Sequence, residues 1–399
     1  MRTPDFKRWS TASTWKEAAY DPGVRAAVFQ VLLALAIAFL AYEIVSNTIE
    51  NLRKQNIASG FGFLAETAGF DISQTPIPYS SKSTYGAAFL VGLANTLIVA
   101  VIGIVIATVL GFAIGIARLS PNWLVAKLAL SYVELVRNLP LLLQLLVWYV
   151  AVLRTLPAPE EALALPGGGF LDVRGLHLPR LALESGGSLL VVVLALALAG
   201  AWWLKRQAAI DREAGRRGPT RAQRVGRVLV IAVPAVALAV AFAASSVTYP
   251  VLGRFNHEGG FSIEPEFLAL VIGLSTYTAA FIAEIVRAGF QGVPRGQREA
   301  AAALGLSRRQ ALRLVILPQS LRIIIPPLTN QYLNLTKNSS LAVAIGYPDL
   351  VSVFSGTVLN QTGQAVEVIL ITMAVYLAIS LATAAFMNWF NMRTSWAER

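Results

Sequence analysis

Long apolar runs alternate along this chain with short stretches that carry most of its charge. A helix needs about 20 consecutive apolar residues to cross the hydrocarbon core of a bilayer. Runs that approach or exceed this length lie at 24–45, 86–117, 128–153, 187–204, 228–245, 266–290, 321–347 and 365–390. The pattern therefore predicts an all-α membrane protein with about eight spans.

The run at 321–347 is the least regular of these. It contains two adjacent prolines, Pro326 and Pro327, together with Asn334 and Lys337. Broken or polar backbone at membrane depth is tolerated where protein buries it or where it lines a water-filled cavity. We therefore expect a proline-broken segment that faces protein or a wet cavity rather than lipid.

The first run follows a basic segment that includes Arg2, Lys7 and Arg8. A cleaved signal peptide is one interpretation of this arrangement. The apolar stretch at 26–42 is longer than the usual apolar region of such a peptide, and further spans follow it. We favour a retained first span, with the cleaved segment as the alternative.

Basic residues indicate which loops face the cytoplasm, where Lys and Arg accumulate. The loop at 205–227 carries eight basic residues against two acidic ones, and 287–322 carries seven arginines against Glu299. Eight spans that begin with a cytoplasmic N-terminus put both loops and the C-terminus on that side. The external connectors are then 46–85, 154–186 and 246–265. Their Pro, Gly and Ser content predicts solvated loops.

Composition excludes several classes of protein. Only 14% of the residues are charged and 56% are hydrophobic, whereas soluble domains carry about 25% charged residues. A soluble enzyme is therefore excluded. The net charge of +11 is explained by basic loops between apolar runs, which argues against a nucleic-acid partner. No cysteine is present, so disulfides and thiolate chemistry are excluded.

The chain offers few groups for catalysis or metal binding. Its two histidines, His177 and His257, lie far apart in predicted loops, and we expect two solvated side chains rather than a metal site. The phosphate-binding pattern G-x-x-x-x-G-K-[ST] does not occur, so the chain cannot hydrolyse ATP alone. We expect no catalytic residue and no cofactor in this chain.

The strongest motif lies at 294–310, after the sixth apolar run. Alanine-rich 297–304 favours a helix, and Gly305 suits the left-handed residue that ends one. Ser307 with Gln310 forms a capping-box pattern that starts a second helix, which we expect to run to Pro318. The loop is thus predicted to be two short helices around a glycine turn.

Three interpretations of this basic loop are open from its residues. A DNA-reading helix-turn-helix is one, although the position between membrane spans argues against it. An amphipathic cytoplasmic loop beside lipid headgroups is the second. The third is a rigid knob that docks into a groove on a cytoplasmic motor protein.

The spacing in this loop resembles the EAA loop of ABC importer permeases. That pattern reads Glu-Ala-Ala, three residues, Gly, nine residues, then Ile-x-Leu-Pro. The matching residues here are Glu299, Ala300, Ala301, Gly305, Leu317 and Pro318, and Val315 departs from the family's Ile. The resemblance implies that a separate ATPase binds this loop, with Gly296 also part of the coupling segment.

A wider stretch, over 86–153 and 265–390, resembles the polar amino-acid branch of these permeases. Its matching residues include Asn95-Thr96, Glu134 to Pro140, Gln144, Gly273, Tyr277, Ala283-Glu284, Arg287, Gly292 to Pro294, Gln319, Arg322, Pro326 to Asn330 and Lys337 to Leu341. The implied fold is the ABC type-1 transmembrane fold, a five-span core with an extra N-terminal span and an inserted pair.

The resemblance divides the chain into three parts. Residues 1–85 hold the cytoplasmic N-terminus, the first span and an external loop. Residues 86–390 form the transmembrane domain, with an insertion at 154–264, and 391–399 form a cytoplasmic tail. This enlarged layout is similar to the broad-specificity importers of glutamate, glutamine, aspartate and asparagine.

The implied function is a permease subunit that moves L-amino acids across the bacterial inner membrane. Its implied partners are an ABC ATPase dimer that binds ATP and Mg²⁺, a second related permease, a periplasmic amino-acid-binding protein and the lipid bilayer. An ion-coupled secondary transporter and a membrane scaffold are the alternatives. A secondary transporter usually shows repeated halves with paired broken helices, and this sequence shows no convincing second half.

Polar and ionisable residues in the spans are candidates for the translocation path, because they are costly in lipid and usually face a cavity or a partner. The candidates are Asn95, Glu134, Arg137, Gln144, Glu284, Arg287, Asn330, Lys337, Asn338, Ser339 and Ser340. Glu134 with Arg137, and Glu284 with Arg287, are three residues apart on one helical face. Ion pairs that fix packing are the structural alternative for these pairs. For 337–340 the alternative is the boundary where the chain leaves the membrane.

Overall fold

The computed structural model describes residues 21–54, 60–182, 246–254 and 256–394, with scattered residues between 193 and 238. Within these residues, five helices are long and apolar enough to cross a membrane. They are α2 (Pro22–Lys54), α3 (Tyr85–Ala117), α8 (Pro265–Gln291), the helical run Arg308–Ile345 that contains α11 (Leu317–Asn338), and α13 (Ala365–Thr394). Five of the predicted spans are therefore present as helices.

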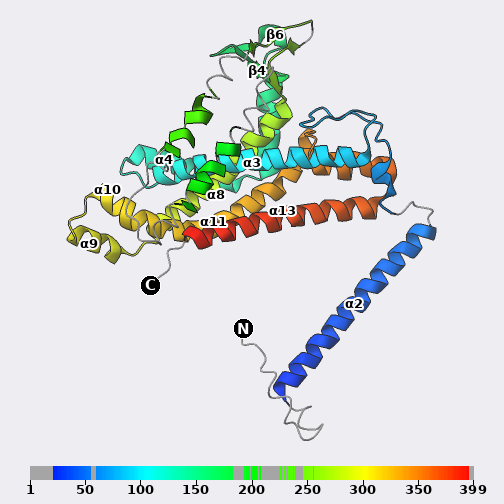
Figure 1. Cartoon of the computed structure of the whole chain (residues 1–399), viewed down its shortest axis with the longest axis horizontal. Helices are drawn as coiled ribbons and strands as arrows, with labels where there is room; N and C mark the ends of the chain where they lie inside the picture. The colour runs from blue at the N-terminus through cyan, green and yellow to red at the C-terminus, as the bar shows by residue number, and fades with distance from the viewer. Residues whose placement is uncertain are drawn as a thin grey trace.

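The core of the bundle lies between α3, α8 and α11 (Figure 1). Small residues let α3 and α8 approach closely, which is how membrane helices gain packing energy. Gly111 of α3 lies against Ile282 of α8, where a Cβ on the glycine would come within 2.5 Å of the isoleucine side chain. Gly115 meets Val286 in the same way. The two helices α3 and α8 are therefore packed closely together at the centre of the bundle.

Helix α2 stands apart from the bundle (Figure 1). None of its most apolar window is buried against the rest of the described chain, and side chains such as Phe29, Leu33 and Phe39 are exposed. An exposed apolar helix of this length fits a span that contacts lipid on its sides.

The predicted third span, 128–153, is wrong as one straight helix. The chain forms α4 (Trp123–Asn138) and then α5 (Leu141–Leu146), which leads into a segment ending at Thr155, and the two parts are bent by 107°. Leu139 is extended (φ −101°, ψ 136°) because the residue before a proline disfavours the helical conformation. Pro140 therefore decides where this helix breaks.

The expected break at Pro326 and Pro327 is also wrong, because α11 continues through both prolines. Buried side chains on either side, Ile324, Ile325 and Leu328, hold this part of α11 against its neighbours. Packing therefore keeps the helix intact where two backbone hydrogen bonds are missing. The α-helix ends at Asn338 instead, and a tighter 3₁₀ segment follows.

The two spans predicted inside the insertion, 187–204 and 228–245, are only partly described. Of the first, a short apolar helix at Ala195–Leu204 is described. In the second, 228–230 and 232–236 are helical. Gly200 lies against Val230, and Gly226 lies against Leu204, so these two pieces contact each other.

The external connectors contain short strands and a few buried side chains, while many of their residues are exposed, as expected of solvated connectors. Phe63 in the connector before α3 is buried against Tyr85 and Phe354. The two ends of the insertion form an antiparallel sheet in the order β1-β2-β3-β8. Its strands are β1 (Leu163–Leu165), β2 (Gly169–Asp172), β3 (Gly175–Leu178) and β8 (Phe261–Ile263). Two further strand pairs are β4 (Arg180–Ala182) with β5 (Ser246–Thr248), and β6 (Val251–Leu252) with β7 (His257–Glu258).

Candidate functional site

The 294–310 loop forms a compact knob of two helices, α9 (Arg295–Ala303) and α10 (Arg308–Ala311). Gly305 has a φ of 72°, in the left-handed region. The Gly305 amide donates to the Ala302 carbonyl at 2.9 Å, and the Leu306 amide donates to the Ala301 carbonyl at 3.1 Å. This pair of bonds is the Schellman motif that ends a helix at glycine. The predicted glycine turn is confirmed.

The second helix of the knob begins with the predicted capping box. The Ser307 hydroxyl accepts from the Gln310 amide, and the Gln310 side chain accepts from the Ser307 amide at 3.0 Å. The prediction that this helix ends at Pro318 is wrong. From α10 the chain passes through a π-helical turn at Leu312–Ile316 directly into α11. Helix α10 and the α11 span are therefore one continuous helical run, and α9 is joined to it by the Gly305 turn.

Most of the knob surface is free in this chain. Gly296, Glu299 and Ala300 are exposed, whereas Ala301 is buried under the knob. Leu304 is 79% exposed at the tip. Leu317 is half-buried and Pro318 is exposed where α11 begins. Figure 1 shows α9 and α10 projecting from the bundle at the end where α13 finishes. The knob therefore offers an exposed carboxylate and an exposed apolar side chain for contact with another protein.

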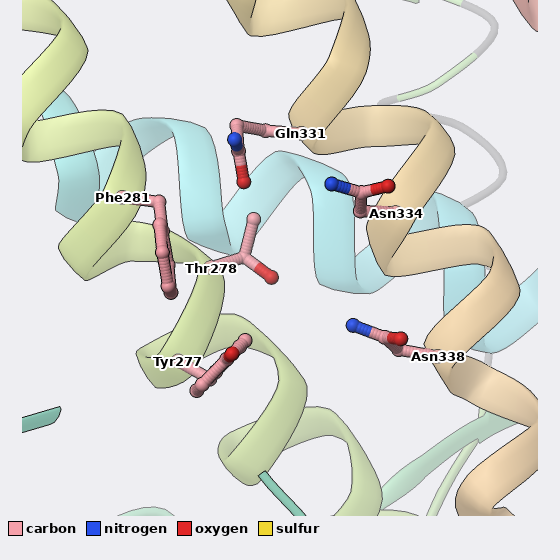
Figure 2. Close-up of a pocket in the computed structure, with 6 residues that line it drawn as sticks. All are labelled: Tyr277, Thr278, Phe281, Gln331, Asn334 and Asn338. Carbon is pink, nitrogen blue, oxygen red and sulfur yellow. The ribbon is translucent and has the colours of Figure 1, made fainter. Parts of the chain in front are cut away.

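A cavity of about 220 Å³ lies between α8 and α11. Its six lining residues are Tyr277, Thr278, Phe281, Gln331, Asn334 and Asn338. The first three come from α8 and the other three from α11. Figure 2 shows the amides of α11 facing the aromatic rings of α8 across the gap. Amide groups both donate and accept hydrogen bonds, so this wall can bind an ammonium and a carboxylate alike.

Arg137 of α4 lies next to this cavity. Its guanidinium carbon is 5.2 Å from the centre of the Phe281 ring, a cation–π contact. The Tyr132 hydroxyl, also on α4, donates to the Thr276 carbonyl of α8 at 2.6 Å and fixes the two helices together. Glu134 is exposed on α4, and no ion pair between Glu134 and Arg137 is among the interactions of the described residues.

Glu284 and Arg287 are placed away from the cavity, in an ion-pair cluster. Arg287 and Arg118 both donate to the Glu284 carboxylate, Arg287 from the next turn of α8 and Arg118 from the end of α3. The structural alternative for this pair, an ion pair that fixes packing, is present. Arg298 of the knob donates to the Phe290 carbonyl of α8 at 2.6 Å. This cluster ties the end of α3 to α8 near the knob.

Two other path candidates, Asn95 and Gln144, donate hydrogen bonds to main-chain carbonyls. The Asn95 amide donates to the carbonyls of Gln74 and Pro348 at 2.9 and 2.8 Å. The Gln144 amide donates to the Val136 and Leu139 carbonyls at 2.8 and 3.0 Å, which would otherwise be left open at the bend.

Two serines just after α11 are also used locally. The Ser339 hydroxyl is buried and donates to the Thr336 carbonyl at 2.7 Å. The Ser340 hydroxyl donates to the Lys337 carbonyl at 2.8 Å. Neither serine lines the cavity.

An exposed polar stripe runs along α11 and consists of Asn330, Asn334 and Lys337. Residues four and three apart share one side of a helix. Such a stripe on a membrane-spanning helix is costly against lipid and instead faces a partner or water. Asn334 belongs both to this stripe and to the cavity wall, so the cavity opens toward the same side.

Five cavity residues were missed as path candidates: Tyr277, Thr278, Phe281, Gln331 and Asn334. The sequence contains a signal for the two on α11, because positions 331, 334 and 338 follow the helical repeat. The α8 residues carry no such signal. Asp349 was also missed. It is fully buried, and its carboxylate accepts from the Ser352 amide at 2.8 Å and the Tyr376 hydroxyl at 3.4 Å.

The prediction for the two histidines is wrong. His177 and His257 are buried, and their rings stack with centroids 4.6 Å apart. The reason is strand pairing, because β3 aligns His177 with Ser262 of β8. This contact joins segments from opposite ends of the insertion.

Comparison with known proteins places these features in a family. Residues 214–396 match the model of the binding-protein-dependent transport system inner membrane component. The chain is 48% identical over 394 residues to the general L-amino acid transport system permease AapQ of Rhizobium johnstonii, covering 98% of this chain and 97% of that protein. It is 50% identical over 382 residues to YhdX of Escherichia coli K12, described as an amino-acid ABC transporter permease, covering 95% and 96%.

A third relative is BztB of Rhodobacter capsulatus, named a glutamate/glutamine/aspartate/asparagine transport system permease. The identity is 41% over 413 residues, covering 95% of this chain and 96% of that protein. All three relatives match along almost their whole length, including the insertion.

Proposed function

The chain belongs to the binding-protein-dependent inner-membrane permeases, in the branch of general L-amino-acid permeases. On that premise we propose which of its residues bind the ATPase and which contact the substrate. It is a multi-pass inner-membrane protein and a non-catalytic permease subunit of an ABC amino-acid importer. The relatives give no support to an ion-coupled carrier.

We propose that an ABC ATPase dimer docks on the α9–α10 knob. Glu299 and Leu304 are exposed there and offer a carboxylate and an apolar contact. ATP and Mg²⁺ bind to the ATPase and not to this chain. The arginines of the knob support a cytoplasmic position for the knob and for both termini.

The cavity between α8 and α11 is the proposed substrate-contacting part of the path. None of its six lining side chains is charged, so it does not sort amino acids by side-chain charge. Arg137, in contact with the Phe281 ring, puts a positive charge near the cavity that would attract the substrate carboxylate. This supports a broad L-amino-acid substrate range, with selection made by a periplasmic binding protein.

A second, related permease completes the path. The polar stripe of Asn330, Asn334 and Lys337 is exposed in this single chain, and a partner subunit would cover it. The relatives' descriptions as components of transport systems fit this assembly.

One observation carries the mechanism: α10 and the α11 side of the cavity belong to one continuous helical run, from Arg308 through α11. Movement of α9 and α10 by the ATPase would therefore be transmitted along this run to Gln331, Asn334 and Asn338. Closure of the motor on ATP would switch the cavity from one side of the membrane to the other.

The proposal is tested by reconstituting the chain in vesicles with its ATPase, second permease and binding protein. Glu299→Lys, at the exposed face of the knob, is expected to abolish vanadate-sensitive uptake while leaving protein levels unchanged. The control Glu160→Lys makes the same charge reversal at an exposed position in an external connector, and should transport normally. Normal uptake and ATPase copurification with Glu299→Lys would contradict the docking proposal. Uptake driven by an ion gradient without ATP would contradict the energy source.

A further inference from the structure

Three buried side chains in the insertion converge on one point. They are Asp172 at the end of β2, His177 on β3 and His257 on β7. The Asp172 Oδ2 atom lies 3.2 Å from His177 Nε2 and 3.1 Å from His257 Nδ1. One ligand atom from each residue lies within 4.8 Å of the other two. Two segments some eighty residues apart thus bring every histidine of the chain to one carboxylate.

The cluster is shielded from water, which makes its polar groups costly unless something satisfies them. Asp172 is 0% exposed, and His177 and His257 are 1% and 7% exposed. The Asp172 Oδ1 atom accepts from the Arg174 amide at 2.7 Å. The Asp172 Oδ2 and His257 Nδ1 atoms form no hydrogen bond within the described chain, although they are close together. His177 Nε2 lies 3.4 Å from Asp172 Oδ1, so the two unpartnered atoms are part of one close group of ligand atoms that a bound ion would satisfy.

The spacing of these atoms fits a tetrahedral metal. Zinc holds nitrogen and oxygen ligands at about 2.0–2.2 Å, so neighbouring ligand atoms in its tetrahedron lie about 3.3 Å apart. The two separations from Asp172 Oδ2, 3.2 and 3.1 Å, are close to this value. Two imidazoles with one carboxylate form a ligand set that zinc and related divalent transition metals favour.

The surrounding residues fix both imidazole rings. His177 Nδ1 lies 2.8 Å from the Ser262 hydroxyl on β8, the kind of second hydrogen bond that orients metal-binding histidines. The His257 ring stacks on both Phe170 and His177, with centroids at 4.8 and 4.6 Å. These contacts restrict the ring, and its Nδ1 atom lies 3.1 Å from Asp172 Oδ2. The two histidine nitrogens are thus held in place for coordination.

We propose that Asp172, His177 and His257 bind one divalent transition-metal ion of the zinc class, which clips the two ends of the insertion together. The ion's role is structural. It joins β2 and β3, before the intervening segment, to β7 after it. Closing a long loop in this way stabilises the closed form, since metal binding free energy is also folding free energy.

The test uses the purified full chain in nanodiscs, with an affinity tag that contains no histidine. The protein is stripped with a chelator, incubated with Zn²⁺ or Co²⁺ alone and passed through a desalting column. We expect one metal per chain by elemental analysis, and a visible Co²⁺ spectrum typical of a four-coordinate site. Asp172→Asn and His257→Gln should each reduce bound metal at least tenfold. The control Asp71→Asn, at an exposed position in another connector, should retain it.

Two outcomes would overturn the proposal. One is wild-type protein that retains no more metal than Asp172→Asn, which would make the cluster a metal-free hydrogen-bonded group. The other is full binding by both variants, which would put the metal elsewhere. If the variants do not fold, the wild-type Co²⁺ spectrum and stoichiometry decide, because the chain has no other histidine and no cysteine to bind the ion.

Discussion

Amide side chains on α11 give the cavity its chemistry, and they do so without buried net charge. Gln331, Asn334 and Asn338 face the aromatic residues of α8 across the cavity (Figure 2). Neighbouring polar residues differ from them, because Ser339 and Ser340 each donate to a carbonyl of their own segment. Polar character therefore does not assign a role by itself; the direction of the side chain does.

We expect Asn338→Ala to weaken transport without affecting assembly. A net hydrogen bond contributes about 0.5–1.5 kcal/mol, so the apparent affinity for substrate should fall roughly 2- to 12-fold. The measurement is the concentration dependence of ATP-driven uptake at matched protein levels. Ser340→Ala removes a polar group next to the cavity that bonds only locally, and should leave the affinity unchanged. Equal affinity in wild type and Asn338→Ala would remove this residue from the path.

Some residues of the candidate site can be predicted from the sequence, and others cannot. Arg137 and Asn338 were predicted because polar residues in spans are rare. Thr278 and Phe281 are ordinary span residues whose role depends on α8 lying against α11. The meeting of His177 with His257 depends on pairing between distant strands, which has no local signal in the chain.

At the scale of elements, proline had opposite effects in two helices. Pro140 bends its helix by 107° next to an exposed Leu139. Pro326 and Pro327 leave α11 intact, because the residues around them are buried against neighbouring helices. Local preference is the same in both places, and packing decides the result. By contrast, the knob was predicted correctly because Gly305, Ser307 and Gln310 act through local hydrogen bonds.

The knob's turn requires a residue that accepts a left-handed conformation. Gly305 has φ of 72°, where a β-branched residue is disfavoured by about 1–2 kcal/mol. We expect Gly305→Val to lower ATPase copurification and uptake strongly, while Gly305→Asn retains more of both, because Asn tolerates this conformation better. No Cβ contact limits either side chain, since nothing lies within 4 Å. Equal losses in the two variants would show that side-chain bulk against the ATPase matters, and not backbone geometry.

On the scale of the whole molecule, the described helices leave one face of the bundle uncovered. Exposed apolar side chains on α13, such as Leu377, suit lipid. The α11 stripe of Asn330, Asn334 and Lys337 does not suit lipid, because polar and charged side chains are costly there. Because the cavity opens at this stripe, the single chain forms only part of the path.

The absence of cysteine from the sequence allows a direct test of this face. Asn334→Cys, modified with a photoreactive maleimide, should cross-link to the second permease in the assembled complex. Leu377→Cys on α13 is the matched control and should label lipid instead. The readout is a shifted band identified by mass spectrometry. Cross-linking to the partner only from Leu377→Cys would place the subunit interface on α13 and contradict the assignment of the stripe.

The pairing of β4 with β5 has one more consequence. Ala182 and Ser246, which bracket the central part of the insertion, lie opposite each other in adjacent strands. Genetic material encoding everything between them could be acquired or lost in a single event, because the chain would need only a tight hairpin to close the gap. The helices that hold the cavity and the knob would keep their positions. The paired strands therefore mark the ends of a segment that a hairpin could replace without moving the core helices.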